Sequence, residues 1–139
     1  DVPLPLRDLP TVEQLKSELA SCTDRVIAER LRRKLVLVEY VGPGPNCSMP
    51  AWVWRIGDAF IVGQPNEAYS EFQIQLREKF RGHAVMVMNL VNGACGYLSP
   101  PENYDVEIYP VLQTPFGRDG LNVLKKHVVN ALEKLVAAE

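Results

Sequence analysis

The stretch that decides the fold is Ala51-Trp-Val-Trp-Arg-Ile56, Gly57-Asp58, Ala59-Phe-Ile-Val62. Two runs of β-branched and aromatic residues are separated by a pair of residues that favour a tight turn. This pattern predicts a β-hairpin over residues 51–62. We assign the remaining elements outward from this hairpin.

Downstream of the hairpin, the apolar residues change their spacing twice. Asn66 is a good N-cap for a helix that contains Tyr69, Phe72, Leu76 and Phe80. Residues 83–90 are almost wholly apolar, which predicts a central strand buried on both faces. A further short strand is expected at residues 106–109. Asp119 then caps a last helix with an apolar face, which should close the core.

Upstream of the hairpin, the pattern is helical. Thr11 and Gln14 form a capping-box pair, which predicts a helix from about Val12. A second helix carries one apolar stripe and one arginine-rich face, and residues 42–50 hold too many prolines and glycines for regular structure. The prolines at positions 3, 5 and 10 predict an extended linker over residues 1–10, arriving from an upstream region.

The composition fits a single globular domain over residues 11–139, which we expect to be a fragment of a larger chain. Of the 139 residues, 47% are hydrophobic and 23% are charged. The order of elements predicts an α/β or α+β fold, with helices packed on a small mixed β-sheet. No apolar run approaches the ~20 residues of a membrane helix, so we expect a soluble chain. Its compartment stays open, and export as part of the parent chain is one alternative.

Charge and cysteine content exclude several classes of function. The net charge of −2 gives no general attraction for nucleic acid, and the arginine-rich helix face is interpreted as a solvated surface. A contact of that face with nucleic acid or lipid remains the minor alternative. The three cysteines lack a ligand spacing or an even count, and Cys95 has no base assigned to make it a nucleophile.

Two loops after strands are candidate sites, because a strand end holds a side chain firmly at an accessible position. One leads to Glu67, which we expect in the first turn of a helix, where the helix dipole favours a carboxylate. The other contains Asn92, Gly93, Gly96 and Tyr97. If the two preceding strands are parallel neighbours, Glu67 and Tyr97 should meet at one edge. A dipole partner for Glu67 and a packed ring for Tyr97 are the plain alternatives.

These two stretches carry a resemblance. Residues 55–67 and 92–98 resemble the second half of the neutral/alkaline non-lysosomal ceramidase family, and the likeness spans most of the chain. The resemblance implies that Glu67 and Tyr97 are zinc ligands, with Tyr97 also at the catalytic centre. Asn66, Asn92, Gly93, Gly96 and Tyr104 are assigned to the pocket.

The resemblance further implies a zinc-dependent amide hydrolase that acts on a lipid-like N-acyl substrate. The two histidine ligands of the family lie in its first half, so zinc would need an upstream half of the same protein. His83 and His127 do not match those ligands. We therefore expect this chain alone to bind zinc weakly and to be inactive. An exposed apolar face should dock the missing half, and this face would also allow a homodimer.

Two other functions remain open from the sequence. Asn66 stands where the family usually has glycine, and Pro110 follows Tyr109 where the family commonly has glutamate. These departures are compatible with a catalytically silent relative that binds a ligand or a protein. The arginine-rich helix leaves a third alternative, an interaction module.

Overall fold

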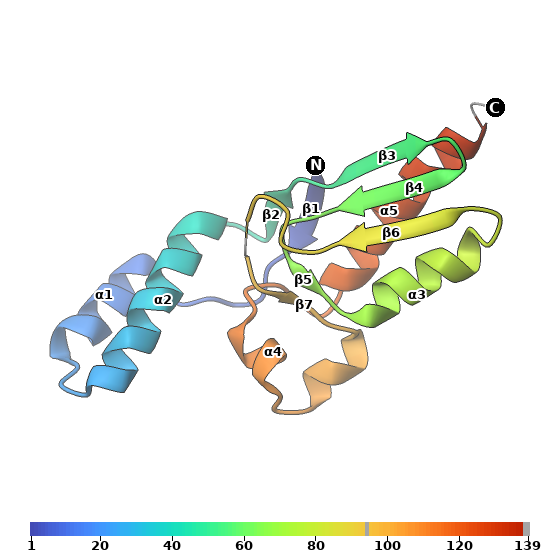
Figure 1. The fold of residues 1–139 in the computed structure, drawn as a ribbon. Helices are drawn as coiled ribbons and strands as arrows, with labels where there is room; N and C mark the ends of the chain where they lie inside the picture. The colour runs from blue at the N-terminus through green and yellow to red at the C-terminus, as the bar shows by residue number, and fades with distance from the viewer. Residues whose placement is uncertain (94, 138–139) are drawn as a thin grey trace.

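The computed structural model describes residues 1–93 and 95–137, and it has a mixed α/β fold, as the sequence predicts (Figure 1). The elements in chain order are β1 (Val2–Pro5), α1 (Val12–Ser21), α2 (Arg25–Val41), β2 (Asn46–Met49), β3 (Trp52–Ile56), β4 (Ala59–Gly63), β5 (Glu67–Ala68), α3 (Ser70–Lys79), β6 (Ala84–Met88), β7 (Tyr97–Leu98), a 3-10 helix (Pro101–Asp105), α4 (Tyr109–Gln113) and α5 (Gly120–Ala137).

The predicted hairpin is confirmed as β3 and β4, which pair antiparallel from Trp52 opposite Gly63 to Ile56 opposite Ala59. Strand β6 then pairs in parallel with β4, so the sheet order is β3-β4-β6. The prediction that the apolar run at residues 83–90 forms the central strand was wrong. Strand β6 lies at an edge, and Ala84 and Met86 are exposed while Val85 between them is buried, because only one face of this sheet is covered by the described residues.

Helices α3 and α5 supply that cover. Helix α5 passes behind the sheet in Figure 1, and α3 runs beside β6 and contacts α5. Phe60 and Val62 of β4 point into this layer and are fully buried, together with Leu76 of α3 and Leu132 of α5. The hydrophobic core therefore lies on one side of the sheet.

The other side of the sheet is apolar and lacks a covering layer among the described residues. The register places Trp54, Ile61 and Met86 side by side across the three strands. Trp54 is 44% exposed, Ile56 65% and Met86 55%. We call these four residues the uncovered sheet face. An apolar patch of this kind is typical of an interaction surface.

The first residues do not form a linker over their whole length, which corrects the sequence prediction. Val2–Pro5 is strand β1, paired antiparallel with β2, and Val2 and Leu4 are buried in the core. Strand β2 likewise lies inside the segment expected to be a loop. Prolines 3 and 5 are compatible with this strand because both lie in a two-stranded pair, where each strand has a free edge.

Helices α1 and α2 form the helical lead, which extends to the left of the α/β body in Figure 1. The predicted capping box is confirmed, since Thr11 and Gln14 exchange hydrogen bonds of 2.7 and 3.1 Å. The Asp24 carboxylate caps α2 by accepting from two backbone N–H groups. No described helix is long and apolar enough to span a membrane.

Two further element predictions were wrong. The strand expected at residues 106–109 is absent; Ile108 instead precedes α4, where Pro110 sits in the first turn and so leaves no helical hydrogen bond unmade. Asn66 does not cap a helix, because β5 intervenes and α3 begins only at Ser70. Glu67 consequently lies in a strand and receives no help from a helix dipole.

Candidate functional site

Glu67 and Tyr97 are direct neighbours on two parallel strands, as expected if their preceding strands ran side by side. Strands β5 and β7 pair in parallel with Glu67 opposite Tyr97. The Glu67 N–H donates to the Gly96 carbonyl at 2.9 Å, and the Tyr69 N–H donates to the Leu98 carbonyl at 3.1 Å. Because paired residues of parallel strands project to the same face, the carboxylate and the phenol share one surface.

The surroundings of Tyr97 keep its hydroxyl protonated. Desolvation raises the pKa of Tyr97, and the charge of Glu67, a hydrogen bond to Glu67 and the neighbouring Tyr109 and Tyr69 raise it further. The ring of Tyr109 meets that of Tyr97 edge to face, with 6.1 Å between the centroids. The phenol can therefore donate a hydrogen bond at neutral pH, and the carboxylate beside it can accept one.

A network of amides around the buried Gln64 holds β5 in place beyond the end of the main sheet. Gln64 is 0% exposed, and its Nε2 donates to the Asn66 carbonyl at 2.7 Å and to Asn89 Oδ1 at 2.6 Å. Its Oε1 accepts from the Asn66 N–H at 2.7 Å, and Asn89 Nδ2 donates to the Ala68 carbonyl at 2.9 Å. Sequence reasoning missed Gln64 and Asn89. A glutamine between the end of an apolar strand and a proline was the available signal.

Asn66 lies beneath the site and not on its surface. It is 1% exposed, and neither its Oδ1 nor its Nδ2 has a hydrogen-bond partner among the described residues. The Ser99 hydroxyl is in the same condition. A buried amide without a hydrogen-bond partner destabilises the folded state. The side chain of Asn66 is therefore a polar group that the described residues leave unsatisfied.

The predicted loop glycines allow close packing behind Tyr97. Gly96 has φ +107, and an added Cβ would lie 2.9 Å from Pro115 Cδ. An added Cβ at Gly93 would lie 3.0 Å from Pro65 Cβ. Asn92 is exposed and also has a positive φ of 55. Gly93 and Gly96 thus fix the backbone that carries Tyr97, whereas Asn92 turns outward at the loop tip.

Tyr104 has partners of its own. Its hydroxyl donates to the Phe116 carbonyl at 3.1 Å, and the Arg118 guanidinium lies 5.9 Å from its ring centroid. Burial raises the pKa of Tyr104. These contacts give Tyr104 a structural role, and its place in the pocket stays a prediction.

Cys95 lies in the same loop as Tyr97, but it is a poor nucleophile. It is buried, and desolvation raises the pKa of its thiol, partly offset by a hydrogen bond from Tyr40. Burial likewise raises the pKa of Cys47. Both thiols are therefore protonated at neutral pH.

The donor set fits part of a metal site. Glu67 and Tyr97 place two oxygen donors on one face, but no cluster of three or more His, Cys, Asp or Glu side chains occurs within residues 1–93 and 95–137. His83 packs on Phe60 with ring centroids 4.5 Å apart, and His127 Nδ1 lies 2.9 Å from the Val123 carbonyl, so both rings have partners other than Glu67 and Tyr97. Zinc normally takes at least three protein ligands, so this pair is only part of a zinc site.

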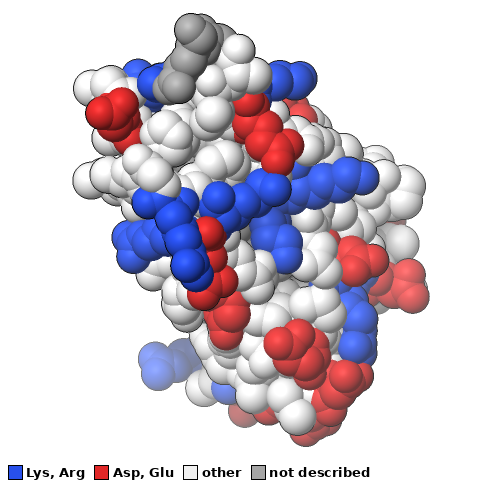
Figure 2. Space-filling model, turned by 90° about the vertical axis from the view of Figure 1, so that its right-hand side faces the viewer, with Lys and Arg blue, Asp and Glu red and all other residues white. Residues whose placement is uncertain are grey.

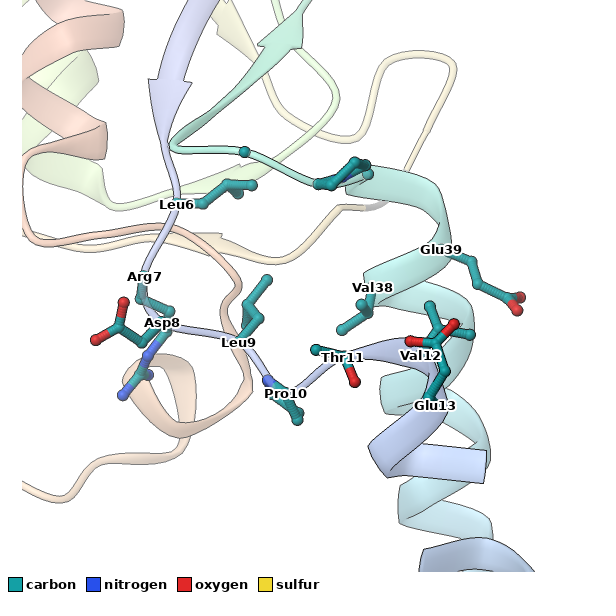
Figure 3. Close-up of a pocket in the computed structure, with 13 residues that line it drawn as sticks. Leu6, Arg7, Asp8, Leu9, Pro10, Thr11, Val12, Glu13, Val38 and Glu39 are labelled. Carbon is teal, nitrogen blue, oxygen red and sulfur yellow. The ribbon is translucent and has the colours of Figure 1, made fainter. Parts of the chain in front are cut away.

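Two grooves flank the helical lead. The first, which we call the α2–α4 groove, lies between residues 25–33 of α2 and residues 109–113 of α4 and has a volume of about 770 Å³. One of its lining residues, Tyr109, contacts Tyr97. A groove of about 890 Å³ lies between residues 6–13 and the end of α2. In Figure 3, Leu6, Leu9 and Val38 point toward one another across this second groove. Neither Glu67 nor Tyr97 lines either groove.

The face opposite the helical lead carries a mixed charge. Figure 2 shows basic side chains crossing the middle of this face with acidic side chains directly beside them. Lys79 of α3 pairs with Glu133 of α5 at 2.9 Å, and Lys125 donates to Gln75 at 2.7 Å. Neighbouring charges of opposite sign weaken the field that a polyanion would need.

Comparison with known proteins gave no match to a family model, to a curated protein or to a solved structure.

Proposed function

We propose that this chain is the C-terminal part of a zinc-dependent amide hydrolase, in which Glu67 and Tyr97 contribute two ligands to a metal site completed by an upstream half. The observation that carries the proposal is the pairing of Glu67 with Tyr97 across β5 and β7. Thirty residues separate them in the chain, yet the fold brings together the two side chains that the ceramidase resemblance selects.

The chain's own residues have distinct parts in this function. Glu67 supplies a charged oxygen, and Tyr97 supplies a phenol oxygen that also donates a hydrogen bond. The Gln64 network and the close packing at Gly96 fix the two strands, so the backbone positions of Glu67 and Tyr97 are set before a ligand arrives. A zinc ion bound there would supply Lewis-acid polarisation of the amide carbonyl and an activated water.

The uncovered sheet face supports the requirement for a partner. Its exposed residues are Trp and aliphatic side chains, and a second layer packed on it would remove them from water. The upstream half of the same protein is the partner that would also supply the missing metal ligands. A catalytically silent relative would bind a partner through the same face, but that partner would not complete the metal site.

The test is hydrolysis of an N-acyl amide by the longest natural chain that contains these residues, with and without zinc. We expect zinc-dependent release of the fatty acid, reduced at least about a hundredfold by Glu67→Gln or Tyr97→Phe. Glu71→Gln, a nearby carboxylate on α3, is the matched control and should leave the rate unchanged. Equal zinc-dependent rates in all of these proteins would overturn the proposal.

A further inference from the structure

The α2–α4 groove combines positive charge with exposed apolar surface. Four arginines and one glutamate line it, which gives four positive charges and one negative, a net of +3. Its apolar members are more than half exposed, with Tyr109 at 65%. The residues that line the groove are Arg25, Val26, Glu29, Arg30, Arg32, Arg33, Tyr109, Leu112 and Gln113.

The charges in this groove are only partly neutralised. Glu29 pairs with Arg33 at 3.0 Å and lies 3.8 Å from Arg32. Arg25 and Arg30 have no ion pair within the described part of the chain. Two guanidinium groups are thus available to an anion, and guanidinium is the side chain best suited to a carboxylate or a phosphate.

The groove is connected to the candidate site through Tyr109. This ring lines the groove and also packs edge to face on Tyr97, the neighbour of Glu67. A ligand that lies along Tyr109 with its carboxylate among the arginines would therefore have the atoms next to that carboxylate, including the amide of an N-acyl amino acid, on the side of the groove that faces Tyr97. A volume of about 770 Å³ is within the range of sites for small molecules.

We infer that the α2–α4 groove binds the anionic end of a single-chain amphiphile, so that the substrate class is an N-acyl amino acid and not a neutral N-acyl lipid. The statement that this ligand is a substrate rests on the proposed function. The binding of an anionic amphiphile in the groove does not. The apolar side chains contact the acyl chain or its neighbouring carbons. Arg25 and Arg30 receive the carboxylate.

The test is calorimetric titration of the 139-residue chain with N-dodecanoylglycine, below its micelle concentration and with a chelator present. The neutral probe is N-dodecanoylglycinamide. We expect the anionic probe to bind at least about tenfold more tightly, the difference that one charge-assisted hydrogen bond supplies. Added salt should reduce this preference.

The variants locate the binding. Arg25→Glu together with Arg30→Glu should lower the affinity for the anionic probe at least about tenfold, and circular dichroism should show an unchanged fold. Lys34→Glu reverses one charge, against two in the double variant, on an exposed part of α2 outside the groove, and should have no effect. Equal affinity for the two probes, or an equal loss in the Lys34→Glu variant, would overturn the inference.

A third arm separates a membrane surface from a dissolved ligand. Binding to vesicles of anionic phospholipid without binding to the dissolved probe would also overturn the inference. Because the titrations contain no zinc, their failure would leave the Glu67–Tyr97 proposal standing. Failure of zinc-dependent hydrolysis would likewise leave standing the inference that the α2–α4 groove binds an anionic amphiphile.

Discussion

Gly96 determines how closely the loop before Tyr97 approaches the rest of the molecule. Its carbonyl accepts the hydrogen bond from Glu67, its φ is +107, and an added Cβ would meet Pro115 at 2.9 Å. Any side chain at this position therefore strains the backbone and also displaces a neighbour. The pairing of Glu67 with Tyr97 depends on a residue without a side chain.

We predict that Gly96→Ala lowers the free energy of unfolding by about 1–3 kcal/mol, because the positive φ and the close contact act together. Urea denaturation followed by circular dichroism measures this loss. Gly82→Ala is the matched control, since a Cβ there meets nothing within 4 Å and its φ is not positive. An equal loss in both variants would show that Gly96 has no special role.

The buried thiols give a dependence on pH. Burial raises the pKa of Cys47 and of Cys95 above the ordinary value of a thiol. The folded state therefore favours the protonated thiols, and this contribution to stability is complete below about pH 9 and is lost as the pH rises through the folded values. We predict that the free energy of unfolding, measured by urea denaturation, falls as the pH rises above about 9.

The same burial protects these thiols from alkylation. At about pH 8, iodoacetamide should modify Cys47 and Cys95 far more slowly in the folded protein than in urea, as peptide mass spectrometry would show. Rapid modification of Cys95 under native conditions would contradict the burial and would reopen a nucleophilic role.

At the scale of elements, local sequence patterns predicted those helix caps, turns and helices that are determined by residues close together in the chain. The capping box at Thr11, the turn at Gly57 and the apolar spacing of α5 each involve groups a few residues apart, and each was found. The sequence did not predict strand β1, because its partner strand is formed by residues 46–49, far along the chain, and because its prolines favour a linker. Such a pairing is set by tertiary contacts that no local pattern contains.

Strand β1 should consequently be essential for stability. Leu4 is fully buried, so Leu4→Ala should cost about 2–5 kcal/mol through lost burial and the cavity that remains. Leu112→Ala removes the same atoms from an exposed position and should cost less than about 0.5 kcal/mol. Thermal and urea unfolding would compare the two. A neutral Leu4→Ala variant would mean that residues 1–10 are a linker after all.

At the scale of the whole molecule, the juxtaposition of Glu67 and Tyr97 was predictable because parallel neighbouring strands bring their ends together. The network of Gln64 and Asn89 was not, since two amides far apart in sequence give no pattern. The α2–α4 groove was also missed. The arginines were interpreted as a solvated face, and only the position of Tyr109 beside them connects that face with the site.

The uncovered sheet face predicts self-association when no other layer is present. We expect a concentration-dependent dimer by analytical ultracentrifugation, because pairing two such faces removes their apolar side chains from water. Met86→Lys should weaken this dimer, since the lysine would be buried without a partner. Val36→Lys, an equally exposed apolar position on α2, should not. A monomer at all concentrations would contradict this expectation.

The central claim is that Glu67 and Tyr97 form half of a zinc site, and calorimetric titration of the 139-residue chain with zinc tests it most directly. We predict binding weaker than about 1 μM, because two protein ligands do not complete a site, and loss of that binding in Glu67→Gln and Tyr97→Phe but not in Glu71→Gln. Submicromolar binding would mean that the site is already complete. Absence of binding at millimolar zinc, or binding that neither substitution removes, would contradict the claim.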